Sequence, residues 1–352
     1  MQIKVTLIMP VYNAERFLKN TLNYVTNQTL KEIEILIIND GSTDKSGLIC
    51  DEYALRDQRV TVIHQKNKGM CASRNLGIDM AQGEYIAFAD NDDEFDENML
   101  KDNYEMAITH HADMIKFGRK CIWTNSDGEV LGTETRKFPE RIMNREEIID
   151  EYFLLQQKDV LTAAWDGMYK TTMLKENKVK FYEHFRYGME DTIFSREAIQ
   201  YANTLILNSE CYYTHIIRGT YSISTKFNRQ ALDKFKEACL LEQQVWKNLG
   251  IDNREDGEKE QSIAKDYLIP VLYVLGSENC NWSLSQKIEY LKELRTIESF
   301  DMKITPAKYR KIKASNRRRG LIISLFDKKH YRLLLFVGAQ YKKIINRRLK
   351  KN

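Results

Sequence analysis

Polar and acidic clusters follow three apolar segments in the N-terminal part of the chain, at the point where each segment ends. The apolar segments have β-like composition and span Val5 to Met9, Ile33 to Ile38 and Tyr85 to Ala89. The clusters are Met9-Pro-Val-Tyr-Asn13, Ile38-Asn-Asp-Gly-Ser-Thr-Asp44 and Phe88-Ala-Asp-Asn-Asp-Asp93. In an open α/β sheet the carboxyl ends of the strands form one crevice, so we expect the three clusters to converge there.

Helical patterns separate these strands. Strand-like segments span Val5 to Met9, Ile33 to Asn39, Val60 to His64 and Glu84 to Ala89. Helix-like segments span Glu15 to Asn27, Asp44 to Arg56 and Gly69 to Ala81. This alternation predicts an α/β fold with a mostly parallel sheet flanked by helices.

The pattern changes along the rest of the chain. A hairpin is expected over Met114 to Trp123 and Glu129 to Phe138, and an extended segment over Leu205 to Ile217. Helical patterns cover 144–156 and 190–202 and then, without further strands, 228–249, 258–276, 284–294 and, with breaks, 305–349. We therefore expect an α/β domain over 1–225 and a helical region over 226–352.

Composition narrows the class of protein. The 352 residues are 43% hydrophobic with only four prolines, which is typical of an ordered globular protein. Six cysteines are scattered without a CxxC pair, so neither a zinc site nor a disulfide framework is expected, and a reducing cytoplasm fits. No signal peptide is evident, and the apolar run from Leu333 to Ala339 is far shorter than the roughly 20 residues that span a bilayer.

Charge is distributed unevenly. Residues 303–352 contain seventeen Lys or Arg and one acidic residue, whereas residues 1–302 carry a net charge of −12. Apolar residues recur at three- and four-residue spacing between the basic ones from Leu333 to Leu349, and Arg317-Arg-Arg319 lies ahead of them. A basic amphipathic helix of this kind favours an anionic membrane surface. Packing on the protein itself or a homo-oligomer contact is the alternative, and no nucleic-acid-binding module accompanies the charge.

The acidic cluster has the chemistry of a divalent-cation site. Asp90, Asp92 and Asp93 end an apolar strand and offer the hard oxygen ligands that Mg²⁺ or Mn²⁺ prefers. Three carboxylates within four residues repel one another unless a cation is present. A cation held there can in turn hold a diphosphate.

Six stretches, in order, resemble the bacterial family 2 glycosyltransferases, which are inverting nucleotide-sugar transferases of the GT-A fold. The stretches are Pro10-Val-Tyr-Asn-Ala14, Asn39-Asp-Gly-Ser-Thr-Asp44, Asn67-Lys-Gly-Met-Cys-Ala-Ser-Arg-Asn75, Phe88-Ala-Asp-Asn-Asp-Asp93, Trp165-Asp-Gly-Met-Tyr-Lys170 and Glu190-Asp191. They cover about residues 1–225, and the basic tail lies outside the resemblance.

The resemblance implies a nucleotide site. Asp40 would accept the uracil N3–H, and its charge would disfavour cytosine, whose N3 is itself an acceptor. Tyr12 would stack on the base. Other residues expected at the nucleotide are Pro10, Val11, Asn13, Lys68, Arg74, Asp90 and Asn91. The alternatives are a turn-forming role for Asp40, plain packing for Tyr12 and a surface ion pair, with Asp79 or another acid, for Arg74.

By position in the motif, Asp92 would bind the metal directly. Asp90 would contact the ribose or a metal-bound water, and Asp93 would support the ligands from behind. Asn91 stands where the family more often has Ser or Ala, which removes no ligand. The alternative is a solvated acidic turn that caps the helix starting near Glu97.

The family's general base corresponds to Asp191, with Glu190 orienting the acceptor or its loop; a helix N-cap is the alternative for Asp191. Trp165 is expected either to stack on a sugar or to pack in the core. His215 is a weaker candidate metal ligand and Arg218 a candidate phosphate contact, both on a strand leading to Ser222-Ile-Ser224. Asp166 and Gly167 depart from the Asn and Lys common in the family.

These features together predict a metal-dependent, non-processive transferase at the inner face of the plasma membrane. It would move one sugar from a nucleotide donor, expected to be a UDP-sugar, to a hydroxyl of a growing surface glycan on a lipid carrier. The alternative is a catalytically inactive nucleotide-sugar-binding or scaffold protein. A nucleotidyltransferase lacks support because no basic, Gly-rich loop follows the first strand, and a dehydrogenase because no GxGxxG does.

Overall fold

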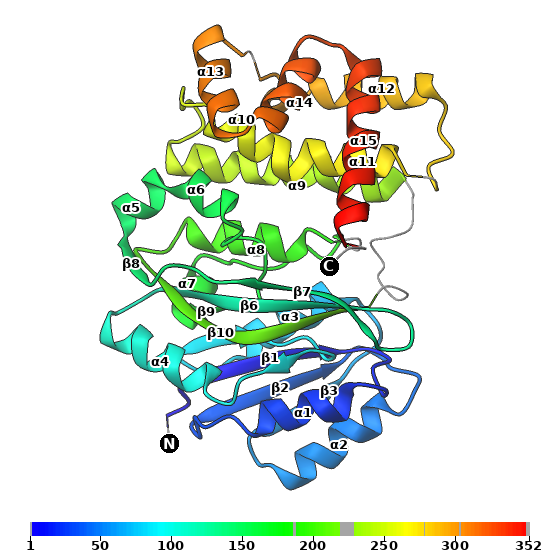
Figure 1. Ribbon diagram of the computed structural model, residues 1–352. Coiled ribbons are helices and arrows are strands. Elements are labelled where there is room, and N and C mark those ends of the chain that lie inside the picture. The colour runs from blue at the N-terminus through cyan, green and yellow to red at the C-terminus, as the bar shows by residue number, and fades with distance from the viewer. Residues whose placement is uncertain (1, 186–187, 219–228, 278, 303, 350–352) are drawn as a thin grey trace. The chain divides into compact units, whose positions relative to one another are not determined.

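The computed structural model describes residues 2–185, 188–218, 229–277, 279–302 and 304–349 (Figure 1), with side chains described up to residue 340 except at 231. The chain forms two compact units. The first unit contains the described residues up to 218, except 149–159 and 188–189. The second unit contains these two segments and the described residues from 229 onward. The domain boundary expected near residue 225 falls outside the described residues.

The first unit is built on a mixed, mostly parallel sheet. Its strands are β1 (Val5–Val11), β2 (Ile33–Asn39), β3 (Val60–His64), β4 (Tyr85–Phe88), β5 (Glu94–Phe95), β6 (Met114–Thr124), β7 (Val130–Arg136), β8 (Arg141–Asn144), β9 (Gly167–Lys170) and β10 (Thr204–Arg218). Within the described residues, ten strands form one sheet in the order β3-β2-β1-β4-β9-β6-β10-β5, with β7 beside β6 and β8 beside β10.

The central strands are buried along their whole length. Every residue of β1 (VTLIMPV) and β2 (IEILIIN) is buried, as expected for parallel strands covered on both faces. Parallel pairing sets Val11 opposite Asn39, and Ile8 opposite Phe88. The polar clusters that follow β1, β2 and β4 therefore emerge side by side at one edge of the sheet, as the sequence predicted.

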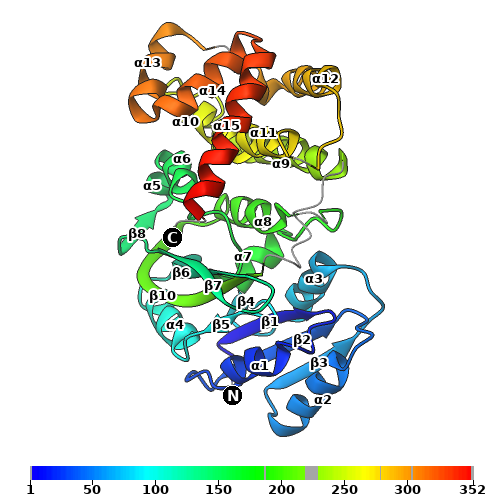
Figure 2. The ribbon, with the colours of Figure 1, turned by 45° about the vertical axis from the view of Figure 1, so that its right-hand side comes forward.

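Helices cover both faces of this sheet. They are α1 (Leu18–Thr26), α2 (Ser46–Arg56), α3 (Met70–Met80), α4 (Met99–Thr109), α5 (Arg145–Asp150, at the boundary of the unit), α7 (Thr171–Glu176) and α8 (Glu190–Ile199). Helices α1 and α2 lie on one side of β1–β3 and α3 lies on the other (Figures 1 and 2). The sequence did not predict β5, β8 or β9, because segments of two to four residues are too short to show a periodicity.

The second unit is helical. It contains α6 (Tyr152–Gln157), α9 (Arg229–Leu249), α10 (Glu258–Ile263), α11 (Ile269–Leu275), α12 (Leu284–Arg295), α13 (Pro306–Ser315), α14 (Arg317–Asp327) and α15 (Tyr331–Leu349). A π-helical turn over Ala264–Leu268 joins α10 to α11, so the single helix expected over 258–276 is interrupted there. Among the described residues, no helix is both long and apolar enough to cross a membrane.

Part of the basic tail belongs to the core of this unit. Helix α15 packs across α11 (Figure 1), and Leu334 is completely buried. A Cβ at Gly338 would lie 2.9 Å from a side-chain atom of Leu272, so the two helices make close contact there. The buried residues of α14 are Gly320, Ile322, Ile323, Leu325 and Phe326. Residues 317–340 therefore form part of the fold of this unit, which agrees with the alternative of packing on the protein itself; the side chains from 341 onward lie outside the described residues.

Candidate active site

A pocket of about 190 Å³ opens where β1, β2 and β4 end. Eight residues line it: Pro10, Val11, Tyr12, Asp40, Met70, Asp90, Asn91 and Asp92. All of them except Met70 were singled out from the sequence. Met70 follows the Lys68-Gly69 turn at the start of α3 and lies in the stretch Asn67 to Asn75 that carries the resemblance, but it was assigned no role there.

Asp40 fixes the loop above this pocket. Its Oδ1 accepts hydrogen bonds from the backbone N–H of Lys68 and from Nε2 of Gln65, both at 2.8 Å, and its Oδ2 accepts one from the N–H of Gly69 at 2.8 Å. Gly69 has a φ of 96°, which favours glycine. A carboxylate oxygen can accept two hydrogen bonds, so Oδ2 keeps capacity for a further donor in the pocket. Lys68 contacts Asp40 through its backbone, and its side chain is exposed.

The loops after β1 and β2 are tied together by Asn13. Its backbone N–H donates to Oγ of Ser42 at 3.1 Å, and its Oδ1 accepts from the N–H of Thr43 at 2.8 Å. Asn13 adopts a φ of 47°, a conformation that asparagine tolerates better than most residues. The expected nucleotide residue Asn13 therefore supports the neighbouring Tyr12, whose side chain is 49% exposed at the rim of the pocket.

Arg74 joins the pocket to a second acidic group. Its Nη2 lies 2.7 Å from Oδ1 of Asp90, and its Nη1 lies 2.9 Å from Oδ1 of Asp191. The guanidinium is completely buried and sits 5.0 Å from the centre of the Phe181 ring. The sequence placed Arg74 at the phosphates or in a surface ion pair. The structure instead gives it two carboxylate partners in the interior.

Asp191 opens helix α8 beside Glu190. Burial, together with the negative charges of Glu190 and Asp90, raises the pKa of Asp191 to about 7, although Arg74 lowers it. Glu190 is buried, and its Oε2 has no hydrogen-bond partner among the described residues. Buried carboxylate oxygens are nearly always paired, so this atom marks a place for a donor such as a hydroxyl or water.

Asp92 is held by an arginine from β10. Its carboxylate pairs with Nη1 of Arg218, and its backbone oxygen accepts from Nη2 at 2.8 Å. The Arg218 guanidinium lies 4.0 Å from the centre of the Phe17 ring. Burial, Asp93 and Asp90 raise the pKa of Asp92 to about 6 although Arg218 lowers it. Arg218, the expected phosphate contact, therefore reaches the acidic cluster; Ser222-Ile-Ser224 lies outside the described residues.

Asp93 orients a histidine. Its Oδ2 accepts from the hydroxyl of Tyr213 and contacts Nδ1 of His215, both at 2.9 Å, and its Oδ1 accepts from the N–H of Ile216 at 2.9 Å. Burial alone would lower the pKa of His215, but the bond to Asp93 and the charges of Asp90 and Asp92 raise it to about 9. A carboxylate bonded to one ring nitrogen is the usual support for a histidine whose other nitrogen binds a metal.

The residues present fit a divalent cation. Ligand atoms of Asp90, Asp93 and His215 all lie within 4.8 Å of one another. Asp93 is 1% exposed and already accepts from three groups, whereas Asp90 and Asp92 line the pocket. Carboxylate oxygens with one imidazole nitrogen form a donor set that suits Mn²⁺ or Mg²⁺.

Trp165 packs behind His215. Its ring stacks on Tyr213 at 4.3 Å and on His215 at 5.0 Å between centroids, and it is only 7% exposed. Of the two roles expected from the sequence, core packing is the one this burial favours. The ring leaves too little free surface for a sugar and instead fixes the position of the histidine.

A buried ion network lies next to Trp165. Asp166 pairs with both Lys116 and Arg119, and all three side chains are at most 4% exposed. A Cβ at Gly167 would lie 2.9 Å from Cδ of Lys116, so Lys116 fills the space that a side chain at 167 would need. The sequence missed Lys116 and Arg119 because they lie about fifty residues before Asp166 with no motif around them.

The network reaches the helix that carries Asp191. Lys116 Nζ donates to the carbonyl of Ala163 at 2.5 Å, and Ser195 Oγ donates to the same carbonyl at 2.6 Å. Thr192 Oγ1 donates to the carbonyl of Thr162 at 3.0 Å. The segment before Trp165 is thereby hydrogen-bonded both to β6 and to α8, the helix on which Asp191 lies.

A mostly parallel sheet of this order, with a pocket and a carboxylate cluster at its carboxyl edge, is typical of the GT-A fold. Comparison with known proteins agrees: residues 6–161 match the family described as "Glycosyl transferase family 2". The chain belongs to the family 2 glycosyltransferases.

Two similar proteins come from Streptococcus pneumoniae and Bacillus subtilis. The chain is 30% identical over 246 residues to "Glycosyltransferase GlyA" of Streptococcus pneumoniae, covering 68% of this chain and 34% of GlyA. It is 30% identical over 211 residues to "Uncharacterized glycosyltransferase EpsJ" of Bacillus subtilis, covering 60% of each. The chain thus spans one third of GlyA and three fifths of EpsJ.

A solved structure shares the fold across both units. The crystal structure of S. aureus TarS 1-349 in complex with UDP-GlcNAc superposes with a TM-score of 0.65 at 20% identity, covering 97% of this chain and 92% of that one. At this identity the likeness establishes the GT-A fold, together with a helical C-terminal region, and nothing finer.

Proposed function

We propose that the protein is an inverting, metal-dependent, non-processive glycosyltransferase. It moves one sugar from a UDP-sugar to a hydroxyl of a growing, lipid-linked surface glycan, at the inner face of the plasma membrane. The proposal depends on one observation: the buried guanidinium of Arg74 forms ion pairs with both Asp191 and Asp90. Asp191 has a raised pKa, and Asp90 lines the pocket proposed for the nucleotide. The UDP-GlcNAc bound by TarS supports a UDP-sugar donor.

In the proposed reaction Asp191 acts as the base. The acceptor hydroxyl gives its proton to the Asp191 carboxylate while its oxygen attacks C1 of the donor sugar. The bond from C1 to the diphosphate oxygen breaks on the opposite face, so the configuration at C1 inverts in one displacement. A positioned base with a pKa near the working pH is well matched to this proton transfer. The Oε2 of Glu190, which has no hydrogen-bond partner among the described residues, accepts a second hydroxyl of the acceptor and orients it.

On the donor side, Asp40 accepts the uracil N3–H and Tyr12 stacks on the base. Asp90, Asp92 and His215 would hold the cation, with Asp93 and Trp165 fixing His215 from behind. The cation supplies charge neutralisation for the departing diphosphate. Arg218, whose guanidinium already lies in the acidic cluster, adds a second positive charge on that side.

A screen of UDP-sugars tests the proposal. Release of UDP from one of them, dependent on Mn²⁺ and increased by an acceptor glycan, is the expected result. If every UDP-sugar bound and none were turned over with any acceptor, the inactive scaffold would be the better explanation.

UDP binding should depend on a divalent cation, and Asp92→Ala should remove that dependence because Asp92 lines the pocket. Isothermal calorimetry of UDP with Mn²⁺ and with EDTA measures this. Since the substitution also releases Arg218, Arg218→Gln serves as the control and should keep the cation dependence. Equal UDP affinity of the wild type in Mn²⁺ and EDTA would contradict the prediction.

Asp40→Asn should weaken the preference for uracil over cytosine, because an amide can donate to cytosine N3. The asparagine amide has one accepting oxygen and one donating NH₂ group, so it cannot accept all three hydrogen bonds from Lys68, Gln65 and Gly69. The loop should therefore also loosen. Competition of UDP against CDP measures selectivity, and Gln65→Leu, which loosens the loop but keeps the carboxylate, is the control. Unchanged selectivity in Asp40→Asn would remove this residue from base recognition.

A further inference from the structure

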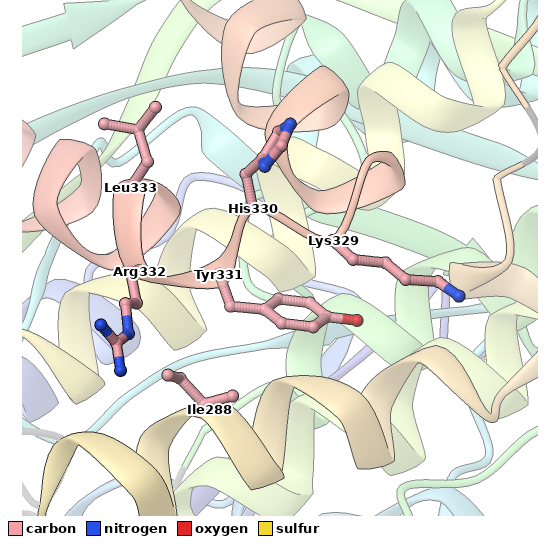
Figure 3. A pocket seen from close by; sticks show the side chains of 6 residues that line it. All are labelled: Ile288, Lys329, His330, Tyr331, Arg332 and Leu333. Atoms are coloured by element: carbon pink, nitrogen blue, oxygen red, sulfur yellow. The ribbon is translucent and has the colours of Figure 1, made fainter.

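A hollow of about 490 Å³ lies on the second unit, between α12 and the start of α15 (Figure 3). It is lined by Ile288, Lys329, His330, Tyr331, Arg332 and Leu333. Figure 3 shows Ile288 of α12 across from Tyr331 and Arg332, with Leu333 and His330 on the other side of the turn. Basic and apolar side chains therefore alternate around a single depression.

The turn between α14 and α15 produces this arrangement. Lys329 has a φ of 61°, and His330 donates its backbone N–H to the carbonyl of Leu325 at 2.8 Å, which ends α14. Buried Tyr331 and Leu334 then anchor the first turns of α15. Because the anchors occupy one side of the helix, the residues between them, Arg332 and Leu333, face solvent.

Large apolar side chains stay exposed beside the basic ones. Leu333 is 51% exposed and Phe336, one turn later on α15, is 60% exposed. Leu321 on α14 is 45% exposed. Exposed apolar residues that gather next to basic groups mark an interaction surface more often than scattered ones do.

The charge around the hollow selects its partner. Lys328, Lys329 and Arg332 are exposed, and residues 303–352 carry a net charge of +16. A free anion would use the basic groups but not Leu333 or Phe336, and a nucleic acid backbone would leave them in water. An anionic lipid surface uses both, because its head groups attract Lys and Arg and its acyl boundary buries Leu and Phe.

We propose that the hollow and the exposed side of α15 from Arg332 to Phe336 dock onto an anionic lipid bilayer. Lys329 and Arg332 would contact lipid phosphates, and Leu333 and Phe336 would enter the interface. This proposal rests on the proposed function in one respect: the surface would bring the transferase to a lipid-linked acceptor. The surface lies within the folded unit, so truncating the tail at residue 315 would remove buried core and cannot test it.

Point substitutions in the full-length chain test the proposal. Sedimentation with phosphatidylglycerol–phosphatidylcholine vesicles is compared for the wild type, Leu333→Gln/Phe336→Gln and Lys329→Glu/Arg332→Glu. Matched controls on the first unit are Leu48→Gln/Leu55→Gln, whose leucines are 67% and 89% exposed, and Lys19→Glu/Lys101→Glu. Each hollow variant should lose about tenfold or more in vesicle affinity, and each control should keep it.

Vesicle binding should also weaken with salt, because attraction between exposed charges is screened over a Debye length of about 10 Å at 0.1 M. Unchanged sedimentation of both hollow variants, equal loss in the controls, or equal binding to pure phosphatidylcholine would each overturn the proposal. A change in mass by light scattering without a change in sedimentation would assign the surface to a second copy of the chain. Displacement by duplex DNA would assign it to nucleic acid.

UDP affinity, measured on the same samples, separates this proposal from the enzymatic one. Wild-type UDP binding without vesicle binding would refute the membrane surface and leave the transferase intact. Vesicle binding without UDP binding would refute the proposed transferase and leave the membrane surface intact.

Discussion

Asp191→Asn should lower the rate of sugar transfer by about 10²-fold or more and leave UDP binding intact. The asparagine Oδ1 can still accept the hydrogen bond from Arg74, so the site keeps its shape, but the amide cannot take the acceptor proton. Initial rates with saturating donor and acceptor give the effect, and calorimetry gives the UDP affinity. Asp79→Asn, which breaks an exposed ion pair with Lys180, is the matched control. Transfer at the wild-type rate would mean that another residue is the base.

The pH dependence gives a second readout of the same residue. Only the deprotonated carboxylate can act as base, so the wild-type rate should rise with pH, be half-maximal near 7, the pKa of Asp191, and level off above it. Stability should change in the opposite direction. The folded protein holds this proton more tightly than the unfolded chain does. The contribution of Asp191 to the free energy of unfolding is therefore largest at low pH and is lost as the pH rises through the pKa of the folded state. A rate profile that is flat between pH 5 and 8 would contradict this assignment.

Arg74→Met should lower the free energy of unfolding by about 3–5 kcal/mol at pH 8. The substitution fills similar volume but leaves the Asp90 and Asp191 carboxylates near each other without a cation between them. Urea unfolding measures the loss, and Arg56→Met, at a side chain that is 71% exposed, is the control. The deficit should shrink at pH 5, because Asp191, whose pKa is raised to about 7, then takes up a proton and no longer repels Asp90.

Arg74→Lys separates charge from geometry. An ammonium keeps the positive charge but cannot hold two carboxylates in the fork of a guanidinium. We expect Arg74→Lys to keep most of the wild-type free energy of unfolding and to transfer sugar at a rate well below that of the wild type. If Arg74→Met were as stable as the wild type at pH 8, the guanidinium would not be the group that holds the two carboxylates together.

Short-range patterns in the sequence predicted the framework of the first unit well. The runs VTLIMPV and IEILIIN are mostly apolar, and every residue of both is buried, as expected for strands covered on both faces. The polar clusters that end these runs predicted where the pocket would open, because parallel strands bring their carboxyl ends to one edge. Family motifs added the order in which donor and acceptor residues occur.

The pairing of charged groups could not be predicted in the same way. Arg74 and Asp191 are 117 residues apart, and nothing near either residue indicates the other. Lys116 reaches Asp166 only because Gly167 leaves space for its side chain. Partners of this kind depend on strand register and on which side chain fills which gap, so they are fixed by packing of distant segments.

Periodicity in the tail had the same limit. The three- and four-residue spacing from Leu333 onward correctly indicated a helix with an apolar side, but spacing alone does not say what covers that side. The structure buries Tyr331 and Leu334 within the helical unit and leaves Leu333 and Phe336 exposed. The sequence by itself thus determined the longer strands, most of the helices and the edge of the sheet where the pocket lies. Only the tertiary structure decided which charges meet and which apolar residues stay in water, because both depend on contacts between segments far apart in the chain.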